Sequence, residues 1–269
     1  MTLSLAVATA LSVPGIAAAA GSNPEQAAFA PSIEVADVPT AQTLYARMFN
    51  LSTRIFPGDP ALYPGAGVVL KGMASFNNSL QLGVGFKANN VVGSGNVKFD
   101  EGQEQVVAAL AKLRVLSVPA VGLQAAVGYD GMGYGVTRKH GLYGVLSKDV
   151  SAGIMVFRLH AGAGTVRFRN ARADRDVNVF AALSGALSED LHLGLEWDDA
   201  IYNDRWSTTP TGSTSLSALT APDRLRDAGS MNAMIAYAWD VGLRLELDFK
   251  NLFRGAHAYY RVLKIQYTF

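Results

Sequence analysis

The four histidines are the side chains of this chain best suited to acid–base or metal chemistry. His140, His160, His192 and His257 stand far apart in the sequence, and none has a metal-ligand spacing such as HExxH. No serine is placed beside an outward-facing histidine to form a nucleophile with its base. The chain has no cysteine, which excludes disulfides, thiolate metal sites and cysteine nucleophiles. We therefore predict no metal site, no cofactor and no catalytic residues.

The charged residues carry more information, because they alternate with apolar residues. In Leu243–Lys250 a charge occupies every second position, and Leu191–Asp198 and Leu80–Lys87 show the same alternation of polar or small residues with apolar ones. An α-helix would scatter such charges around its surface, and a dry core would bury them at a high cost in free energy. A β-strand with one face toward lipid and the other toward water accommodates them.

The alternation assigns a set of charged side chains to the inside of the strand assembly, basic in the early strands and acidic or mixed in the later ones. Two interpretations remain open. Basic and acidic walls could face each other across a narrow pore and steer polar or anionic solutes, or the charges could pair and fill the lumen of a structural barrel. The predicted lumen-lining residues are Arg54, Lys71, Lys87, Lys112, Arg114, Arg158, Glu196, Asp198, Arg244, Glu246, Asp248 and Lys264.

Strand-like segments of about ten residues recur along most of the chain. Short turns predicted at Asn77-Asn78, Ser117-Val118, Lys148–Ser151, Ser188–Asp190 and Asp240 alternate with longer links. Short turns on one side and long loops on the other are typical of outer-membrane barrels, in which the short turns are periplasmic. The twelve predicted segments are 42–55, 65–76, 79–90, 104–116, 119–130, 139–148, 152–167, 176–187, 190–201, 229–239, 241–252 and 259–269.

The last strand has a terminal pattern of its own. Phe269, Tyr267 and Ile265 fall on one face of it, and polar residues fall on the other. This pattern resembles the closing strand of bacterial outer-membrane β-barrels, where a terminal Phe and alternate apolar residues form the assembly signal. The resemblance implies that the barrel-assembly machinery is a partner. A soluble all-β barrel or sandwich is the rival fold. Nearly every strand would then expose its polar face to water, and the apolar faces of all the strands would have to fill one interior.

Composition and the amino terminus agree with an envelope protein. The chain is 49% hydrophobic and 17% charged, yet no apolar run after the amino terminus reaches the roughly 20 residues of a membrane helix. The net charge of +1 argues against nucleic acid as a partner. Residues 1–20 form an Ala-rich apolar stretch, which predicts a signal peptide, although no Lys or Arg precedes it. Residues 21–41 are predicted to be an extended periplasmic leader, and residues 42–269 the barrel.

Two stretches resemble a known family. Pro31–Ala41, with its Pro39-Thr40-Ala41 motif, is similar to the start of YjbH-like outer-membrane proteins, and Val127–Tyr134 followed by Tyr143–Lys148 is similar in pattern. That family is associated with exopolysaccharide production or export. The resemblance implies a role in the cell envelope but assigns no catalytic residue.

Together these features predict an all-β fold: a transmembrane antiparallel up-and-down β-barrel of about twelve strands in the bacterial outer membrane, with both termini periplasmic. The expected function is non-enzymatic, a structural or accessory role in an envelope or surface-polysaccharide assembly. A narrow porin-like channel for small polar or anionic solutes is the alternative, and an outer-membrane hydrolase is less favoured. The expected partners are outer-membrane lipid and lipopolysaccharide, the barrel-assembly machinery and other envelope proteins, with no nucleic acid.

Overall fold

The computed structural model describes most of the strand-forming part of the chain. The described residues are 34–36, 38–56, 66–92, 107–131, 140–152, 155–166, 177–188, 190–198, 230–239, 242–250, 252 and 260–269. The predicted signal peptide (1–20), the first part of the predicted leader (21–33) and most of the longer links lie outside them. Within these residues no helix is long and apolar enough to cross a bilayer.

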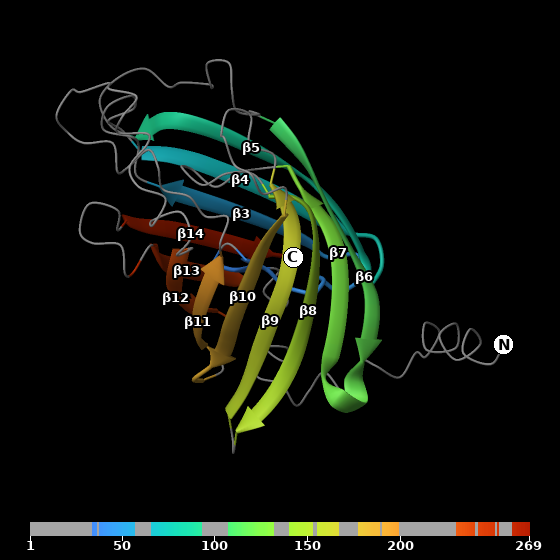
Figure 1. Ribbon diagram of the computed structural model, residues 1–269. Helices are drawn as coiled ribbons and strands as arrows, with labels where there is room; N and C mark the ends of the chain where they lie inside the picture. Colours follow the sequence, from blue (N-terminus) through green and yellow to red (C-terminus); the bar gives the residue numbers. More distant parts are fainter. Residues whose placement is uncertain are drawn as a thin grey trace.

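Twelve antiparallel strands close into a single barrel, which confirms the predicted fold class and strand number (Figure 1). Each strand pairs with its neighbour in sequence, and β14 returns to pair with β3, so that Lys264 lies opposite Arg54. The strands are β3 (Phe49–Phe56), β4 (Ala66–Ser75), β5 (Leu80–Val92), β6 (Val107–Val118), β7 (Leu123–Asp130), β8 (His140–Ala152), β9 (Met155–Val166), β10 (Val177–Ala186), β11 (Leu191–Asp198), β12 (Ser230–Ala238), β13 (Leu243–Lys250) and β14 (Tyr260–Thr268).

The two faces of the barrel wall differ in the way the alternation predicts. Along β13, Arg244, Glu246 and Asp248 are buried on the inner face, and the leucines between them lie on the outer face. Among the described side chains of the twelve strands, the outward positions carry only two charges, Lys148 and Arg261. The charges of this chain are therefore collected inside the barrel and its apolar side chains outside, which is the reverse of a soluble domain.

The connections between strands alternate in length. Five of them span two to four residues, and the others span at least nine. The short ones share one end of the barrel, which we call the tight-turn end. The first barrel strand starts at this end and the last one finishes there. The amide of Phe49 donates to the carbonyl of Phe269 at 2.8 Å, and the amide of Phe269 donates to the carbonyl of Phe49 at 3.0 Å.

Two predicted turns are wrong. Ser117 and Val118 end β6, and the turn that follows consists of the 3₁₀ turn η2 (Pro119–Val121) with Gly122 at φ 61°. Proline cannot donate to a strand ladder, so the strand ends before it. The polar residues Lys148–Ser151 lie within β8, where Asp149 stands directly opposite Arg158 of β9 and pairs with it. A cross-strand ion pair favours the extended conformation at a place where polarity alone indicates a turn.

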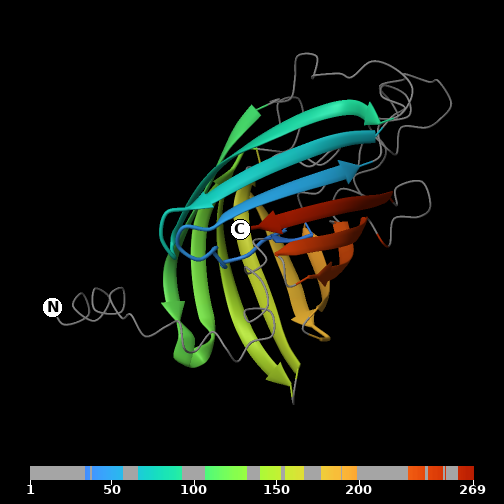
Figure 2. The same cartoon turned by 180° about the vertical axis from the view of Figure 1, so that it is seen from behind.

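The amino-terminal segment also differs from its prediction. Its residues 34–36 and 38–41 lie inside the barrel instead of forming an extended leader outside it, and the first barrel strand begins at Phe49, not at residue 42. β1 (Glu34–Val35) and β2 (Val38–Pro39) pair only with each other, as a small hairpin separate from the barrel sheet. Figure 2 shows this blue segment within the barrel from behind. We call residues 34–44 the plug; Asp37 within it is not described.

The chain turns from the plug into the wall at the tight-turn end. Tyr45, Ala46 and Arg47 are exposed there, and Arg47 has φ 66°, in the left-handed region. The Arg47 amide donates to the carbonyl of Ser75 at 2.9 Å, which fixes this turn against the end of β4. The plug thus enters the lumen from the end of the barrel that holds the short turns and Phe269.

Candidate functional site

The barrel interior contains a continuous basic surface, which we call the basic wall. Five strands that are neighbours in the sheet, β14, β3, β4, β5 and β6, each carry at least one inward-facing cation. These five strands contain no Asp or Glu. The members of the basic wall, each at most 5% exposed, are Lys264, Arg54, Lys71, Lys87 and Lys112. Anions that neutralise the basic wall must therefore come from other parts of the molecule.

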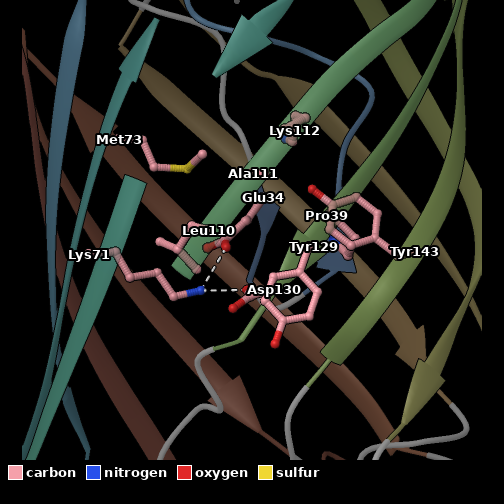
Figure 3. A pocket seen from close by; sticks show the side chains of 10 residues that line it. All are labelled: Glu34, Pro39, Lys71, Met73, Leu110, Ala111, Lys112, Tyr129, Asp130 and Tyr143. Carbon is pink, nitrogen blue, oxygen red and sulfur yellow. Dashed lines mark hydrogen bonds and ion pairs between the residues drawn. The ribbon is translucent and has the colours of Figure 1, made fainter. Parts of the chain in front are cut away.

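The plug supplies one of these anions. The Glu34 carboxylate pairs with the Arg54 guanidinium through Oε2, and its Oε1 lies 3.1 Å from Nζ of Lys71. Nζ of Lys264 lies 4.0 Å from Oε2. Three cations from three adjacent strands thus surround one carboxylate, and all of these side chains are at least nine-tenths buried. Figure 3 shows Lys71 joined by dashed lines to Glu34 and to Asp130.

Two wall carboxylates complete the pairing of these cations. Asp130, at the end of β7, accepts from Nζ of Lys71 at 2.8 Å, and Glu246 of β13 accepts from Nζ of Lys264 at 2.7 Å. Glu246 also accepts from Nε of Arg244 at 3.2 Å. The acidic and basic residues therefore pair along the wall and with the plug, as in the predicted alternative in which the charges fill the lumen.

A second group of lumen residues holds the backbone of the plug. The Val38 amide donates to Oε2 of Glu196 at 2.9 Å, and Nδ2 of Asn232 donates to Oε1 of the same carboxylate at 2.7 Å. Nζ of Lys250 lies 3.8 Å from Glu196 and 3.5 Å from Asp248. Glu196 thus binds the turn side of the hairpin, while the basic wall binds Glu34.

His160 also helps to hold the backbone of the plug, through Ser147. Its Nδ1 lies 2.8 Å from Oγ of Ser147 and its Nε2 lies 3.1 Å from Oγ of Ser184. Oγ of Ser147 accepts a hydrogen bond from the Ala41 amide at 2.9 Å. The array lies buried on the inner face, where it anchors the plug. His192 is also buried on the inner face, and His257 lies outside the described residues.

The end of the plug near the tight turns is held by polar contacts with the wall and its first short turn. Nζ of Lys112 donates to the carbonyl of Gln42 at 3.1 Å. Oγ1 of Thr43 donates to the carbonyl of Asn78 at 2.6 Å, and Oδ1 of Asn78 accepts from the Ala46 amide at 2.7 Å. None of these contacts belongs to a strand ladder.

Apolar side chains pack the plug against the inner wall. Val35, Ala36, Val38 and Ala41 join a buried cluster with wall residues of β7, β8, β10 and β12, and Leu44 joins a second cluster with residues of β3, β4, β6 and β14. A cavity of about 20 Å³ remains beside Glu34, Lys71 and Tyr143, which is room for about one water molecule. The plug therefore packs against both sides of the described inner wall at this level.

The structure places the predicted lumen-lining residues on the inner face. Arg114 is the most exposed of them, near the tight-turn end of β6, and the other eleven are buried. Arg54, Lys71 and Lys264 meet at Glu34, Arg244 and Lys264 meet at Glu246, and Arg158 pairs with Asp149 on the neighbouring strand. Lys87 lies over the ring of Phe56 at 6.0 Å.

The sequence analysis missed Glu34 and Asp130. Glu34 lies in a Pro-rich segment without strand periodicity, so no local signal placed it in the lumen. Asp130 ends the alternating stretch Leu123–Asp130, and the period of two could have assigned it to the inner face. The predicted assembly-signal residues Ile265, Tyr267 and Phe269 lie on the outer face of the barrel.

The arrangement provides little for metal or acyl-transfer chemistry. In the described part of the chain, no three His, Asp or Glu side chains gather as metal ligands would. The two hydroxyl groups beside His160, those of Ser147 and Ser184, both contact this histidine on the buried inner face, and that of Ser147 also accepts from the plug. What the interior can do is bind anions, because its cations gather on adjacent strands.

Comparisons with known proteins find solved structures that resemble this barrel, with low sequence identity and low TM-scores. No family model and no curated protein sequence matches the chain. Among solved structures it is similar to the KdgM porin (12% identity, TM-score 0.47, covering 82% of this chain and 99% of the porin). It is also similar to Omp33 of Acinetobacter baumannii (10%, 0.45, 83% and 98%) and to an outer membrane channel of Pseudomonas putida (11%, 0.43, 85% and 97%).

At this level of similarity the neighbours do not assign a function to the chain. The resemblance to YjbH-like proteins stays a prediction that depends on its short motifs. The function has to be argued from the barrel itself.

Proposed function

We propose that this protein is an integral β-barrel of the bacterial outer membrane. The proposal depends chiefly on the outer face, whose described strand positions carry only Lys148 and Arg261 as charges. A contiguous apolar surface of this extent would cause aggregation in water. A barrel that spans a bilayer needs such a surface to face the lipid. The strands have eight to thirteen residues, a range that brackets the about 9–11 residues in which a tilted strand crosses the hydrocarbon core.

The tight-turn end is proposed to face the periplasm. Aromatic rings gather at that end: the ring centroids of Phe49 and Phe269 lie 5.2 Å apart, those of Tyr267 and Phe269 5.4 Å, and those of Tyr237 and Trp239 4.7 Å. Such rings form the girdles at the membrane interfaces of outer-membrane barrels, whose short turns are periplasmic. Phe269 would then meet the barrel-assembly machinery, and lipopolysaccharide would contact the opposite end.

Within the membrane we infer a non-enzymatic, structural or accessory role for the resting protein, in an envelope or surface-polysaccharide assembly. The observation that carries this inference is the plug, which occupies the lumen and pairs its Glu34 with three wall cations. A filled lumen does not provide the continuous water path that an open porin needs. An outer-membrane hydrolase is less favoured, because the His160 array faces the plug.

A channel for small polar or anionic solutes is the second candidate function. The basic wall favours it, since five adjacent strands with inward cations and no carboxylates would select anions if the plug were displaced.

Fractionation and electrophysiology test these proposals together. The purified protein should show a heat-modifiable shift on gels and should fractionate with outer membranes, and in planar bilayers the wild type should give no stable single-channel steps. Fractionation as a soluble periplasmic protein without a heat shift would refute the membrane proposal. Stable, ion-selective steps in the wild type would refute the closed-barrel role and favour the channel.

A further inference from the structure

We propose that Arg54, Lys71 and Lys264 form a carboxylate-binding site in the lumen, that Glu34 of the plug is its built-in ligand, and that a soluble carboxylate competes with Glu34 for it. The inference goes beyond the closed-barrel role, because it assigns an exchangeable ligand to the interior. It depends on the lumen geometry and does not depend on the membrane proposal.

The first argument is the composition of the basic wall. β14, β3 and β4 are adjacent strands without any carboxylate, and their inward cations converge on one point. Clustered cations repel one another when they are withdrawn from water, so the cluster needs an anion at this point. Asp130 lies beside Lys71 and Glu246 beside Lys264, while the Glu34 carboxylate lies within 4.0 Å of all three cations.

The second argument is the way in which the site holds that anion. A guanidinium contacts one carboxylate oxygen and an ammonium the other, and such charge-assisted hydrogen bonds are roughly twice as strong as neutral ones. The Arg54 guanidinium also donates to the Ala36 carbonyl at 2.9 Å. The cavity next to Glu34, lined by Lys112 and Tyr143 among others, adds space for a ligand slightly larger than the Glu side chain.

The third argument is that the ligand is exchangeable. The hairpin β1–β2 is a separate sheet, so its withdrawal breaks no ladder hydrogen bond of the barrel. Its contacts with the wall are ion pairs, single hydrogen bonds and small apolar side chains.

Full-length variants test the site by calorimetry in detergent, with glutarate as the probe and its uncharged diamide as the control ligand. Glu34→Gln removes the charge of the built-in ligand and keeps its shape, so glutarate should bind this variant at least tenfold more tightly than the wild type. Adding Lys71→Gln should weaken binding about tenfold, the usual effect of one charged hydrogen bond. Adding Arg158→Gln removes an equal buried lumen charge that pairs with Asp149 of the barrel wall, and binding should change less than twofold.

A measurement on the unmodified wild type covers the case in which a variant does not fold. Hydrogen exchange of the peptide that covers 34–44 reports the Val38 and Ala41 amides, which bond to Glu196 and Ser147. Saturating glutarate should speed their exchange at least tenfold, and the diamide should not. The proposal is overturned by unchanged exchange, by equal binding of the diamide, or by equal losses in the Lys71 and Arg158 variants. Failure of the heat shift would instead count against the membrane proposal alone.

Discussion

Leu195→Arg provides the sharpest test of where this barrel resides. Leu195 lies at the middle of β11 on the outer face, with Leu183 and Ala233 beside it on the neighbouring strands, and it is 42% exposed. In a soluble barrel an arginine at so exposed a position would change the free energy of unfolding by about 0.5 kcal/mol or less. In a bilayer the same side chain would stand near the midplane, at a cost of about 2–4 kcal/mol.

Leu191→Arg is the matched control. Leu191 lies on the same face of the same strand, four residues nearer the tight turn. Four residues correspond to about 13 Å along the strand, or roughly 9 Å of depth at the usual tilt. That displacement brings the arginine close to the interface, where the cost falls to about 0–1 kcal/mol. The expected difference between the two variants is therefore about 1–4 kcal/mol.

Reversible urea unfolding in phospholipid vesicles, followed by tryptophan fluorescence, measures both variants against the wild type. Both substitutions create the same side chain on the same strand, so any difference reports depth in the membrane. Equal and small changes for the two variants would sink the argument that the outer face contacts lipid.

The remaining predictions concern the turns, the buried charges and ion flow. Gly242 has φ 81°, and a Cβ there would lie 2.2 Å from a backbone carbonyl of β14, so Gly242→Ala should lower the free energy of unfolding by about 1–3 kcal/mol. Gly144→Ala, with open space for a Cβ, should be neutral or slightly stabilising; equal urea midpoints would contradict this reasoning. Glu246→Gln leaves Lys264 without its 2.7 Å partner and should cost about 3–5 kcal/mol, and a double-mutant cycle with Lys264→Met should recover much of the loss. An additive cycle would show that the pair is not coupled. In planar bilayers, Glu34→Gln should conduct more often than the wild type and favour anions over cations; a silent variant would show that the plug stays in place without its charge.

The sequence determines a large part of the architecture. A period of two is a local property, so Leu243–Lys250 by itself shows which side chains share a face, and the same reasoning places Arg54 and Lys112 inside. The carboxy-terminal strand and the alternation of link lengths then give the strand number. Local polarity is less reliable at the turns: Lys148–Ser151 continues a strand because Asp149 finds Arg158 across the ladder.

Only the tertiary structure decides what the inward charges do. Glu34 stands in a segment with no periodicity. Its partners Arg54 and Lys71 come from the consecutive strands β3 and β4, and Lys264 joins them only because the barrel closes between β14 and β3. Closure brings cations of strands that themselves contain no carboxylate onto one surface, and burial makes an anion there necessary. Which anion fills the site depends on proximity in space and on the electrostatic cost of an unpaired charge, and a local pattern in the sequence encodes neither of these.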